Sequence, residues 1–124
     1  MQYMLLIYGD ESAGAQMTEE EGAKIGQAYA DYSKWLADKG WMRAGDPLRD
    51  TAHATTVRVR NGETVTTDGP FAETKEQLGG YYLIECESLD EALEWARRNP
   101  SAETGHVEVR PLIEMPATVG KGAT

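Results

Sequence analysis

The chain has 124 residues, of which 12 are lysine or arginine and 21 are aspartate or glutamate, so its formal net charge at pH 7 is −9. A chain of this length is expected to form one domain that buries a core without disulfides or metals. The negative charge, with no run of basic residues, argues against a nucleic-acid partner and against binding to an anionic membrane.

Targeting signals are not evident in the sequence. The longest apolar run, residues 4–8, is too short to cross a bilayer. The first residues have neither the basic region nor the cleavage site of a signal peptide. The single cysteine, Cys86, has no partner for an internal disulfide. These features predict a cytoplasmic protein.

The first third of the chain predicts a strand, a loop and a helix. Residues 2–8 are almost continuously apolar, which is typical of a strand buried on both faces. Residues 9–17 are small and polar, and we expect a loop. A helix is expected to begin at Thr18, which forms a capping box with Glu21, and to end at Gly40. Its inward positions follow the helical period: Ile25, Ala28, Tyr29, Tyr32, Trp35 and Leu36.

The middle of the chain predicts strands. Residues 41–45 begin a second strand, which Pro47 limits. The pair Asn61-Gly62 lies between two alternating segments, residues 54–60 and 63–67, and indicates a tight hairpin. Residues 80–87 predict the next strand.

The last third predicts a helix and a final strand. Ser88 and Glu91 suggest a second capping box, and Pro100 after Asn99 ends the helix. Residues 106–115 predict the last strand, with Pro111 at a sheet edge. The helix residues expected to face inward are Leu89, Ala92, Leu93 and Ala96. Residues 116–124 lack bulky side chains, so we expect a mobile tail.

The order β-α-β-hairpin-β-α-β leaves one face of the sheet without helices, because two helices cover only one face. Alternation along the strands groups Met4, Leu6, Tyr82 and Ile84 on one side, and Leu5, Ile7, Tyr81 and Leu83 on the other. Both sides are apolar. The simplest cover for the second side is the same sheet of a second copy, related by a twofold axis.

Four segments resemble a known family: MQYMLLIYGDE, TVTTDGPFAETKEQLGGYYLIE, SLDEALEWARR and VEVRPLIEM. Together they resemble the YCII-related proteins of the DGPF type, and the resemblance spans residues 1–115. It implies an α+β, ferredoxin-like βαββαβ sandwich with a β-hairpin insertion. It also implies that two copies dimerise through their sheets into an α/β barrel.

The resemblance leaves the activity open. Most members have no established activity, some occur beside or fused to extracytoplasmic-function sigma factors, and one branch includes a dehydrochlorinase that acts on an aromatic ring. The branch with a proposed enzymatic site pairs a histidine on the first helix with an Asp-Pro after the second. This chain has no histidine between Thr18 and Lys39, and Asn99 precedes Pro100. That chemistry is therefore not carried over.

Asp68 is the candidate catalytic residue of the block DGPFAETKEQ at residues 68–77. Its carboxylate either caps backbone N–H groups at Gly69 or Phe71 in an Asx-turn, or serves as a base or ligand acceptor at the mouth of a pocket. An N–H-capped carboxylate has a lowered pKa and is a poor base, so the two roles compete. The structural role is favoured.

The other candidate ligand-binding residues are Phe71, Glu73, Lys75, Tyr82 and Arg110. The charged part of the block is either a solvated face or a loop that orients a polar ligand or forms a salt bridge between subunits. Arg110 inside a barrel would hold a carboxylate, whereas an exposed strand arginine would not. Tyr82 is expected to lie in the core, in an interface, or with its hydroxyl in a cavity.

No metal site or cofactor is expected. His53 and His106 lack the spacing of metal ligands, and no glycine-rich phosphate loop is present. Cys86 is expected to pack as a small hydrophobic residue.

Three functions remain open. The first is a homodimeric barrel that binds a small organic molecule in a cleft bordered by DGPFAETKE, with chemistry of the lyase or isomerase type. The second is a non-catalytic accessory or regulatory module linked to extracytoplasmic-function sigma factor signalling. The third is a structural homodimer without a ligand.

Overall fold

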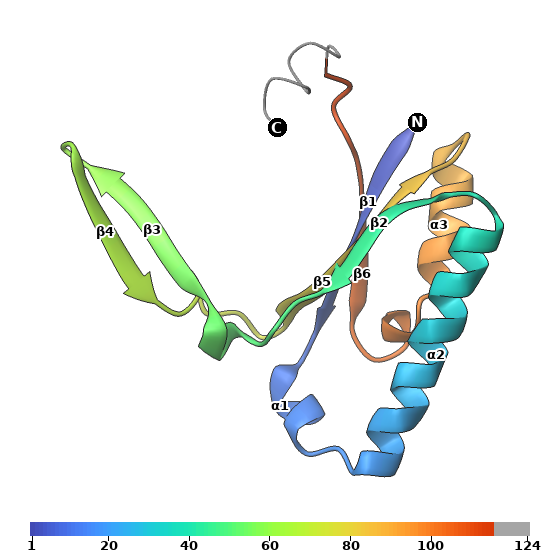
Figure 1. Ribbon diagram of the computed structural model, residues 1–124, viewed down its shortest axis with the longest axis horizontal. Coiled ribbons are helices and arrows are strands. Elements are labelled where there is room, and N and C mark those ends of the chain that lie inside the picture. The colour runs from blue at the N-terminus through green and yellow to red at the C-terminus, as the bar shows by residue number, and fades with distance from the viewer. Residues whose placement is uncertain (116–124) are drawn as a thin grey trace.

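The computed structural model describes residues 1–115 and contains helices, a four-stranded sheet and a separate hairpin (Figure 1). In chain order the elements are β1 (Gln2–Gly9), α1 (Glu11–Ala15), α2 (Glu19–Asp38), β2 (Met42–Pro47), β3 (Thr55–Arg60), β4 (Glu63–Asp68), β5 (Gln77–Glu85), α3 (Leu89–Arg97) and β6 (His106–Pro111). Short 3₁₀ turns occupy Thr51–His53 and Pro100–Ala102. No helix among residues 1–115 combines the length and apolarity needed to cross a membrane.

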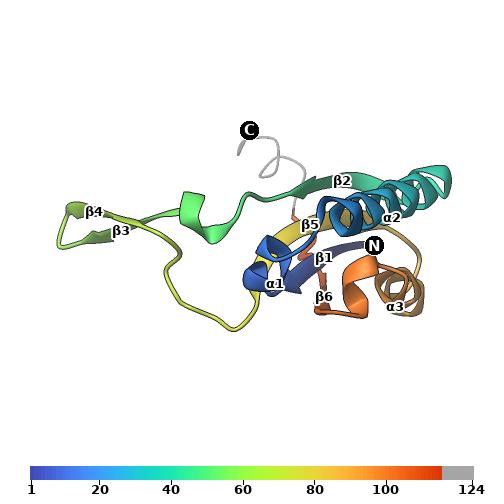
Figure 2. The ribbon, with the colours of Figure 1, turned by 90° about the horizontal axis from the view of Figure 1, so that it is seen from below.

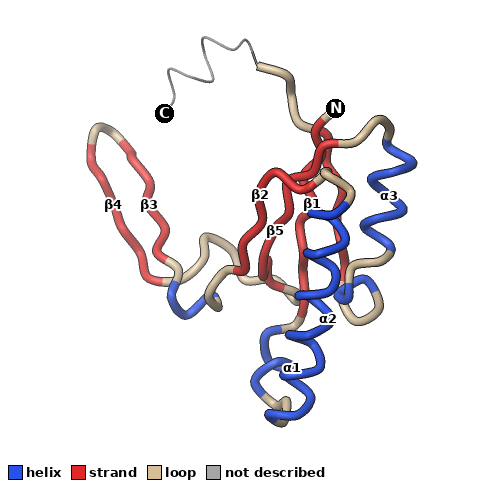
Figure 3. The backbone as a smooth tube through the Cα atoms, turned by 45° about the vertical axis from the view of Figure 1, so that its right-hand side comes forward, coloured by secondary structure: helices blue, strands red, loops and turns tan. Residues whose placement is uncertain are grey.

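The strand order of the main sheet is β2-β5-β1-β6, and every neighbouring pair is antiparallel. Two β-α-β units interlock to give this order, which is consistent with a ferredoxin-like arrangement. The α+β class predicted from the sequence is confirmed. Helices α2 and α3 lie on the same side of the sheet, to the right of the strands in Figures 1 and 2, and Figure 3 shows them in blue beside the red strands.

The register of β1 and β5 corrects the predicted grouping of the two faces. Leu5 lies opposite Tyr82, and Met4 lies opposite Leu83. Opposite residues of an antiparallel pair point to the same side, so the helix-facing set contains Leu5, Ile7, Tyr82 and Ile84, all of them buried. The other side, which we name the open face, carries Met4, Leu6, Tyr81 and Leu83, all half-buried. Alternation assigns residues to sides within one strand but does not show how two strands pair.

Helix α2 begins and ends as predicted. The Thr18 hydroxyl accepts a hydrogen bond from the backbone N–H of Glu21 (3.1 Å), and the Glu21 carboxylate accepts one from the Thr18 N–H (3.4 Å). Gly40 has φ of 75°, which favours glycine at this end of the helix. Tyr32 and Leu36 are buried against the sheet, whereas Ile25 and Trp35 remain exposed.

Residues 9–17 were expected to be a loop, but they contain the short helix α1. The Asp10 carboxylate caps this helix by accepting a hydrogen bond from the Ser12 N–H (2.9 Å). None of the five helical residues is buried. The sequence therefore carries no apolar period that would have indicated a helix.

Helix α3 buries two of the four predicted residues and one that was not predicted. Ala92, Trp95 and Ala96 are buried, while Leu89 and Leu93 are exposed. The indole of Trp95 packs edge-on against Trp41, with ring centroids 5.3 Å apart. Trp95, rather than Leu89 or Leu93, is thus the large side chain that α3 buries.

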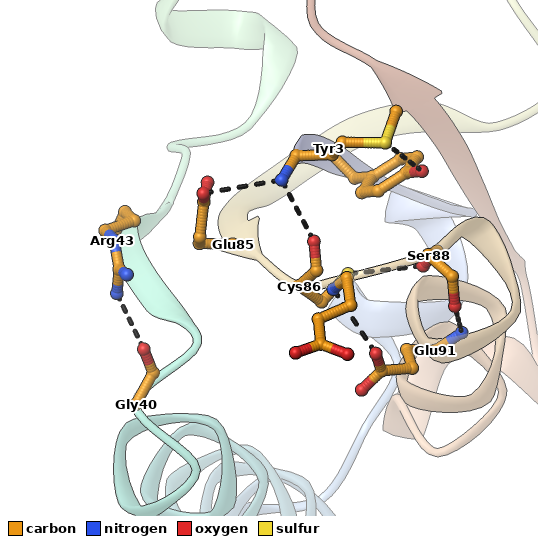
Figure 4. Close-up of polar contacts among 9 residues, drawn as sticks. Tyr3, Gly40, Arg43, Glu85, Cys86, Ser88 and Glu91 are labelled. Carbon is orange, nitrogen blue, oxygen red and sulfur yellow. Dashed lines mark hydrogen bonds and ion pairs between the residues drawn. The ribbon is translucent and has the colours of Figure 1, made fainter.

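The predicted capping box of α3 is only half formed. The Ser88 hydroxyl accepts from the Glu91 N–H (3.3 Å), but the Glu91 carboxylate accepts from the N–H of Glu87 (3.3 Å) rather than that of Ser88. Figure 4 shows this cap beside Cys86. The Cys86 thiol is buried and contacts the Ser88 carbonyl (3.4 Å), and burial raises the pKa of the thiol. The expectation that Cys86 packs as a small core residue is confirmed.

The hairpin β3–β4 forms as predicted and stands apart from the main sheet (Figures 1 and 3). Asn61 and Gly62 both have positive φ, 52° and 77°, as a tight two-residue hairpin requires. We name residues 55–68 the arm. The last strand, β6, ends at Pro111, earlier than predicted, and the expected mobile tail lies outside the described residues.

Candidate functional site

A cavity of about 550 Å³ lies between α2 and the helix-facing side of the sheet. Successive turns of helix α2 place small or polar residues along the cavity: Gly26, Tyr29, Ala30 and Ser33. Strands β2 and β5 form the floor, and the segment that joins β1 to α1 closes one end. A cavity of this size accommodates a small organic molecule.

Glycines make the floor of the cavity possible. A Cβ atom on Gly45 would lie 2.8 Å from Cδ1 of the Tyr82 ring and 3.0 Å from the Met42 side chain. A Cβ atom on Gly80 would lie 3.0 Å from the Asp46 carbonyl oxygen. Because any larger residue would collide, the glycines let β2 and β5 approach while the Tyr82 ring lies over Gly45.

Two hydroxyl pairs provide hydrogen-bonding groups. The Tyr82 hydroxyl lies 2.7 Å from Oγ of Ser33, and either group can donate. The Tyr29 hydroxyl donates to Oδ1 of Asn99 (3.1 Å) and contacts Oγ of Ser101. Asn99 is only 1% exposed and also accepts from the Ser101 N–H (2.9 Å), so it fixes this pair.

The hydroxyls of Tyr29 and Tyr81 remain protonated at neutral pH. Burial raises the pKa of Tyr29 above its usual value, although the hydrogen bond with Ser101 lowers it in part. The Tyr81 hydroxyl donates to Oδ2 of Asp46 on the open face (2.7 Å), and this hydrogen bond raises the pKa of Tyr81. These groups therefore act as neutral donors and acceptors rather than as bases.

The end of the cavity at α1 is held by Glu11. Its backbone N–H donates to Oε1 of Gln77 (3.0 Å), and its carboxylate accepts from the N–H (2.8 Å) and the hydroxyl (2.7 Å) of Thr51. Asp10 beside it has a lowered pKa because it accepts hydrogen bonds from the Ser12 side chain and backbone. Both carboxylates are thus engaged in hydrogen bonds within the protein.

The charges around the cavity have one sign. Its charged lining residues are Asp10, Glu11 and Asp46, and no lysine, arginine or histidine within residues 1–115 lines it. An anionic ligand would lose its hydration in this cavity and would gain no cationic partner, so its transfer from water would cost free energy. The lining favours a ligand that is uncharged or positively charged.

The candidate residues from the sequence are not brought together. Tyr82 lines the cavity, and of the block at residues 68–77 only Gln77 does. Asp68, Glu73 and Lys75 are exposed in or beside the arm, and Phe71 is 90% exposed. Arg110 is exposed on β6, opposite Met4 of the open face.

The predicted Asx-turn at Asp68 is wrong. Within the described residues the Asp68 carboxylate makes no hydrogen bond, and the turn is held by other groups. The Gly69 N–H donates to the Ala54 carbonyl (2.7 Å), and the Thr56 hydroxyl donates to the Gly69 carbonyl (2.8 Å). Gly69 has φ of 98°, so a glycine rather than an Asx side chain makes the reversal.

The histidines form separate carboxylate pairs. Nδ1 of His53 lies 2.7 Å from Asp50, and Nδ1 of His106 lies 2.7 Å from Glu76. Among residues 1–115 there is no group of three metal-ligating side chains. The pair with His106 links the charged block to the start of β6 on the protein surface.

Sequence reasoning missed Ser33, Tyr29 and Ser101 as lining residues. A usable signal was present on α2, where Gly26, Tyr29 and Ser33 follow one another at helical spacing. A glycine and a serine on the side of a helix that otherwise packs on a sheet indicate space next to that helix.

The comparison with known families covers almost the whole chain. Residues 1–116 match the model of the YCII-related domain. The chain belongs to the YCII-related family. This YCII-related protein is also 44% identical over 114 residues to the uncharacterized protein R00369 of Rhizobium meliloti (strain 1021), with 90% of this chain and 92% of the relative covered.

A solved structure gives a more distant comparison. This YCII-related protein resembles the 5-chloro-2-hydroxyhydroquinone dehydrochlorinase (TftG) of Burkholderia phenoliruptrix AC1100, solved in complex with 2,5-dihydroxybenzoquinone. The two chains are 16% identical, with a TM-score of 0.48, and the match covers 93% of this chain and 96% of the other.

Proposed function

We propose that this YCII-related protein binds a small organic molecule, uncharged or positively charged, in the cavity between α2 and the sheet. The observation that carries the proposal is a cavity with a glycine floor, two hydroxyl pairs and only acidic charges. Ligand pockets combine apolar walls with a few polar groups that fix orientation, and this cavity has that composition.

The hydroxyl pair of Ser33 and Tyr82 suits a hydroxylated or amine-bearing ligand. Since either oxygen can be the donor, one proton occupies the contact between them and the other stays free to point at a ligand. The pair can therefore donate to a carbonyl or accept from a hydroxyl or ammonium group. The ring of Tyr82 beside Gly45 offers an apolar surface for an aromatic ligand.

Binding is better supported than proton transfer. A general base needs a free acceptor near the ligand and a pKa near the working pH. Glu11 is engaged by Thr51, Asp46 is engaged by Tyr81, and the pKa of Asp10 is lowered. Lyase or isomerase chemistry would require one of these carboxylates to exchange its partner for the ligand.

We also propose that the protein is a homodimer whose subunits meet through their open faces. Met4, Leu6 and Leu83 are half-buried there, and neither α2 nor α3 covers them. Stable interfaces bury about 1,600 Å² in total, which is about 800 Å² from each copy.

Helix α2 offers a matched pair of variants that tests the binding site. Gly26 lines the cavity, whereas Gly22 lies one turn earlier and does not. A Cβ atom meets nothing within 4 Å at either position. Gly26→Leu and Gly22→Leu should each stabilise the helix by up to about 0.8 kcal/mol, so neither is expected to harm folding.

The probes are phenols, benzylamines and benzoates, with binding followed by ligand-observed NMR. We expect phenols or benzylamines to bind the wild type and the Gly22→Leu protein. Gly26→Leu should weaken binding by about tenfold or more, because the leucine occupies the cavity. The proposal would be contradicted if benzoates bound more tightly than phenols and benzylamines, or if Gly26→Leu left the affinity unchanged.

A further inference from the structure

The arm has almost no support from its own chain. Strands β3 and β4 pair with each other, and within residues 1–115 no other element makes an extensive contact with either of them. A two-stranded hairpin alone in water is marginally stable at best. An arm of this kind therefore needs a surface outside the chain to cover it.

One face of the arm exposes two valines. Val57 and Val59 are 60% and 56% exposed, and the register places them beside Thr66 and Thr64 on the same face, which also carries Thr55 and Asp68 at its base. At the base of the arm Phe71 is 90% exposed, and it is the only phenylalanine of the chain. Exposed aromatic and branched side chains that line one surface mark a contact with another molecule.

The direction of the arm identifies where that molecule lies. In Figures 1 and 2 helices α2 and α3 are on one side of the sheet, and the arm extends from the other side. The open face is on this second side. A sheet packed on the open face would lie about 10 Å away, and strands of six residues reach about 20 Å. The arm is therefore long enough to pass the gap between two stacked sheets.

The charge of the arm suits a second copy of the same chain. Residues 55–68 contain Arg58 and Arg60 against Glu63 and Asp68, so the arm is neutral. The net charge of −9 lies entirely in the rest of the chain. Two acidic bodies repel each other, and an arm without net charge can approach an acidic partner without adding to that repulsion.

We propose that the arm and Phe71 dock on a second copy of this chain, an inference that rests on the homodimer proposed above. In the twofold pair each arm extends past the contact between the open faces and packs the Val57–Val59 face against the partner. Phe71 lies at the base of the arm and fills the contact there. The dimer is thus interlocked by exchanged arms as well as stacked through its sheets.

Two variants and two matched controls test the arm by sedimentation equilibrium across the micromolar range. Phe71→Ala removes a side chain that has almost no contact within its own chain, so the fold of the subunit should not change. Val57→Thr combined with Val59→Thr keeps the β-branched shape and removes the apolar surface. The controls are Met17→Ala, an exposed apolar residue beside α2, and Val65→Thr on the opposite face of the arm.

We expect each test variant to raise the dimer Kd by about tenfold or more, as truncation of an interface hot spot does, and the controls to change it by less than about threefold. Hydrogen exchange adds a second readout. The amides of residues 55–68 should be protected at concentrations where the dimer forms and should lose protection on dilution.

Three results would overturn the proposal. The first is a wild type that stays monomeric at high micromolar concentration. The second is a dimer whose Kd neither test variant changes, or whose arm amides stay unprotected. The third concerns salt: added salt should lower the Kd by screening the acidic bodies. A Kd that rises with salt would show that the arginines of the arm, and not its valines, hold the partner.

Discussion

Strands β1 and β3 both carry branched apolar side chains but have opposite surroundings. Leu5 of β1 is 0% exposed, because helices cover its side of the sheet and strands flank it on both edges. Val57 of β3 is 60% exposed in a hairpin that no other element within residues 1–115 covers. Alternating side chains and turn residues are sufficient to form a strand, but burial depends on what covers the strand.

The largest expected effect compares these two strands directly. Leu5→Ala should lower the free energy of unfolding by about 2–5 kcal/mol, because it leaves a cavity in a packed core. Val57→Ala should lower it by about 0.5 kcal/mol or less in the monomer, since its side chain is exposed. Urea denaturation at low protein concentration measures both. Equal losses would mean that the arm is packed within its own subunit.

An intermediate effect is expected at Tyr32, inside the covered side of the sheet. Its hydroxyl donates to the Trp95 carbonyl (2.6 Å), and burial raises the pKa of Tyr32 above the usual value of 10.0. Tyr32→Phe should cost about 1 kcal/mol at neutral pH because the Trp95 carbonyl loses its partner.

The pH dependence of the Tyr32 variant has a definite sign. The unfolded chain releases the phenolic proton near pH 10, whereas the folded protein retains it. The stabilising contribution is therefore complete below pH 10 and is lost as the pH rises further. The wild type should lose stability above pH 10 more steeply than Tyr32→Phe. Parallel curves of stability against pH would refute this role of the buried hydroxyl.

The smallest expected effect lies at the end of the arm. Asp68→Ala and Asp68→Asn should each change the free energy of unfolding by about 0.5 kcal/mol or less, because the exposed carboxylate has no partner within residues 1–115. Glu11→Ala, which removes the acceptor of two hydrogen bonds from Thr51, should cost about 1 kcal/mol or more. Thermal denaturation of the three variants tests the difference. A large loss at Asp68 alone would reinstate the carboxylate as a structural group.

Elements whose signals are local were predictable from the sequence. The cap at Thr18 and Glu21 gave the start of α2, and Asn61-Gly62 gave the hairpin. Helix α1 was missed because contacts distant in sequence support it. Glu11 of this helix bonds Thr51 and Gln77, and neither is near it in the chain. The buried face of α3 depends on Trp41, another distant residue.

The candidate site was harder to predict than the fold. The acidic, basic and aromatic residues at positions 68–77 predicted a site at the base of the arm. Most of the charged side chains there are exposed to solvent instead. The cavity is instead assembled from single residues of α2, β2 and β5, and its glycines matter only because Gly45 lies opposite Tyr82. That register is a property of the folded sheet. No short stretch of sequence contains it.

Glu11 connects the cavity to the arm. It lines the cavity, and its carboxylate accepts hydrogen bonds from Thr51 in the segment that leads to the arm. Gln77 and Glu11 line the cavity, and Thr51 lies in the connection between β2 and the arm. If binding of a ligand changes the affinity between subunits by some factor, association must change the affinity for the ligand by the same factor. Ligand titrations at low and high protein concentration would then give different apparent affinities. The ratio of those affinities measures the free energy of coupling between ligand binding and subunit association.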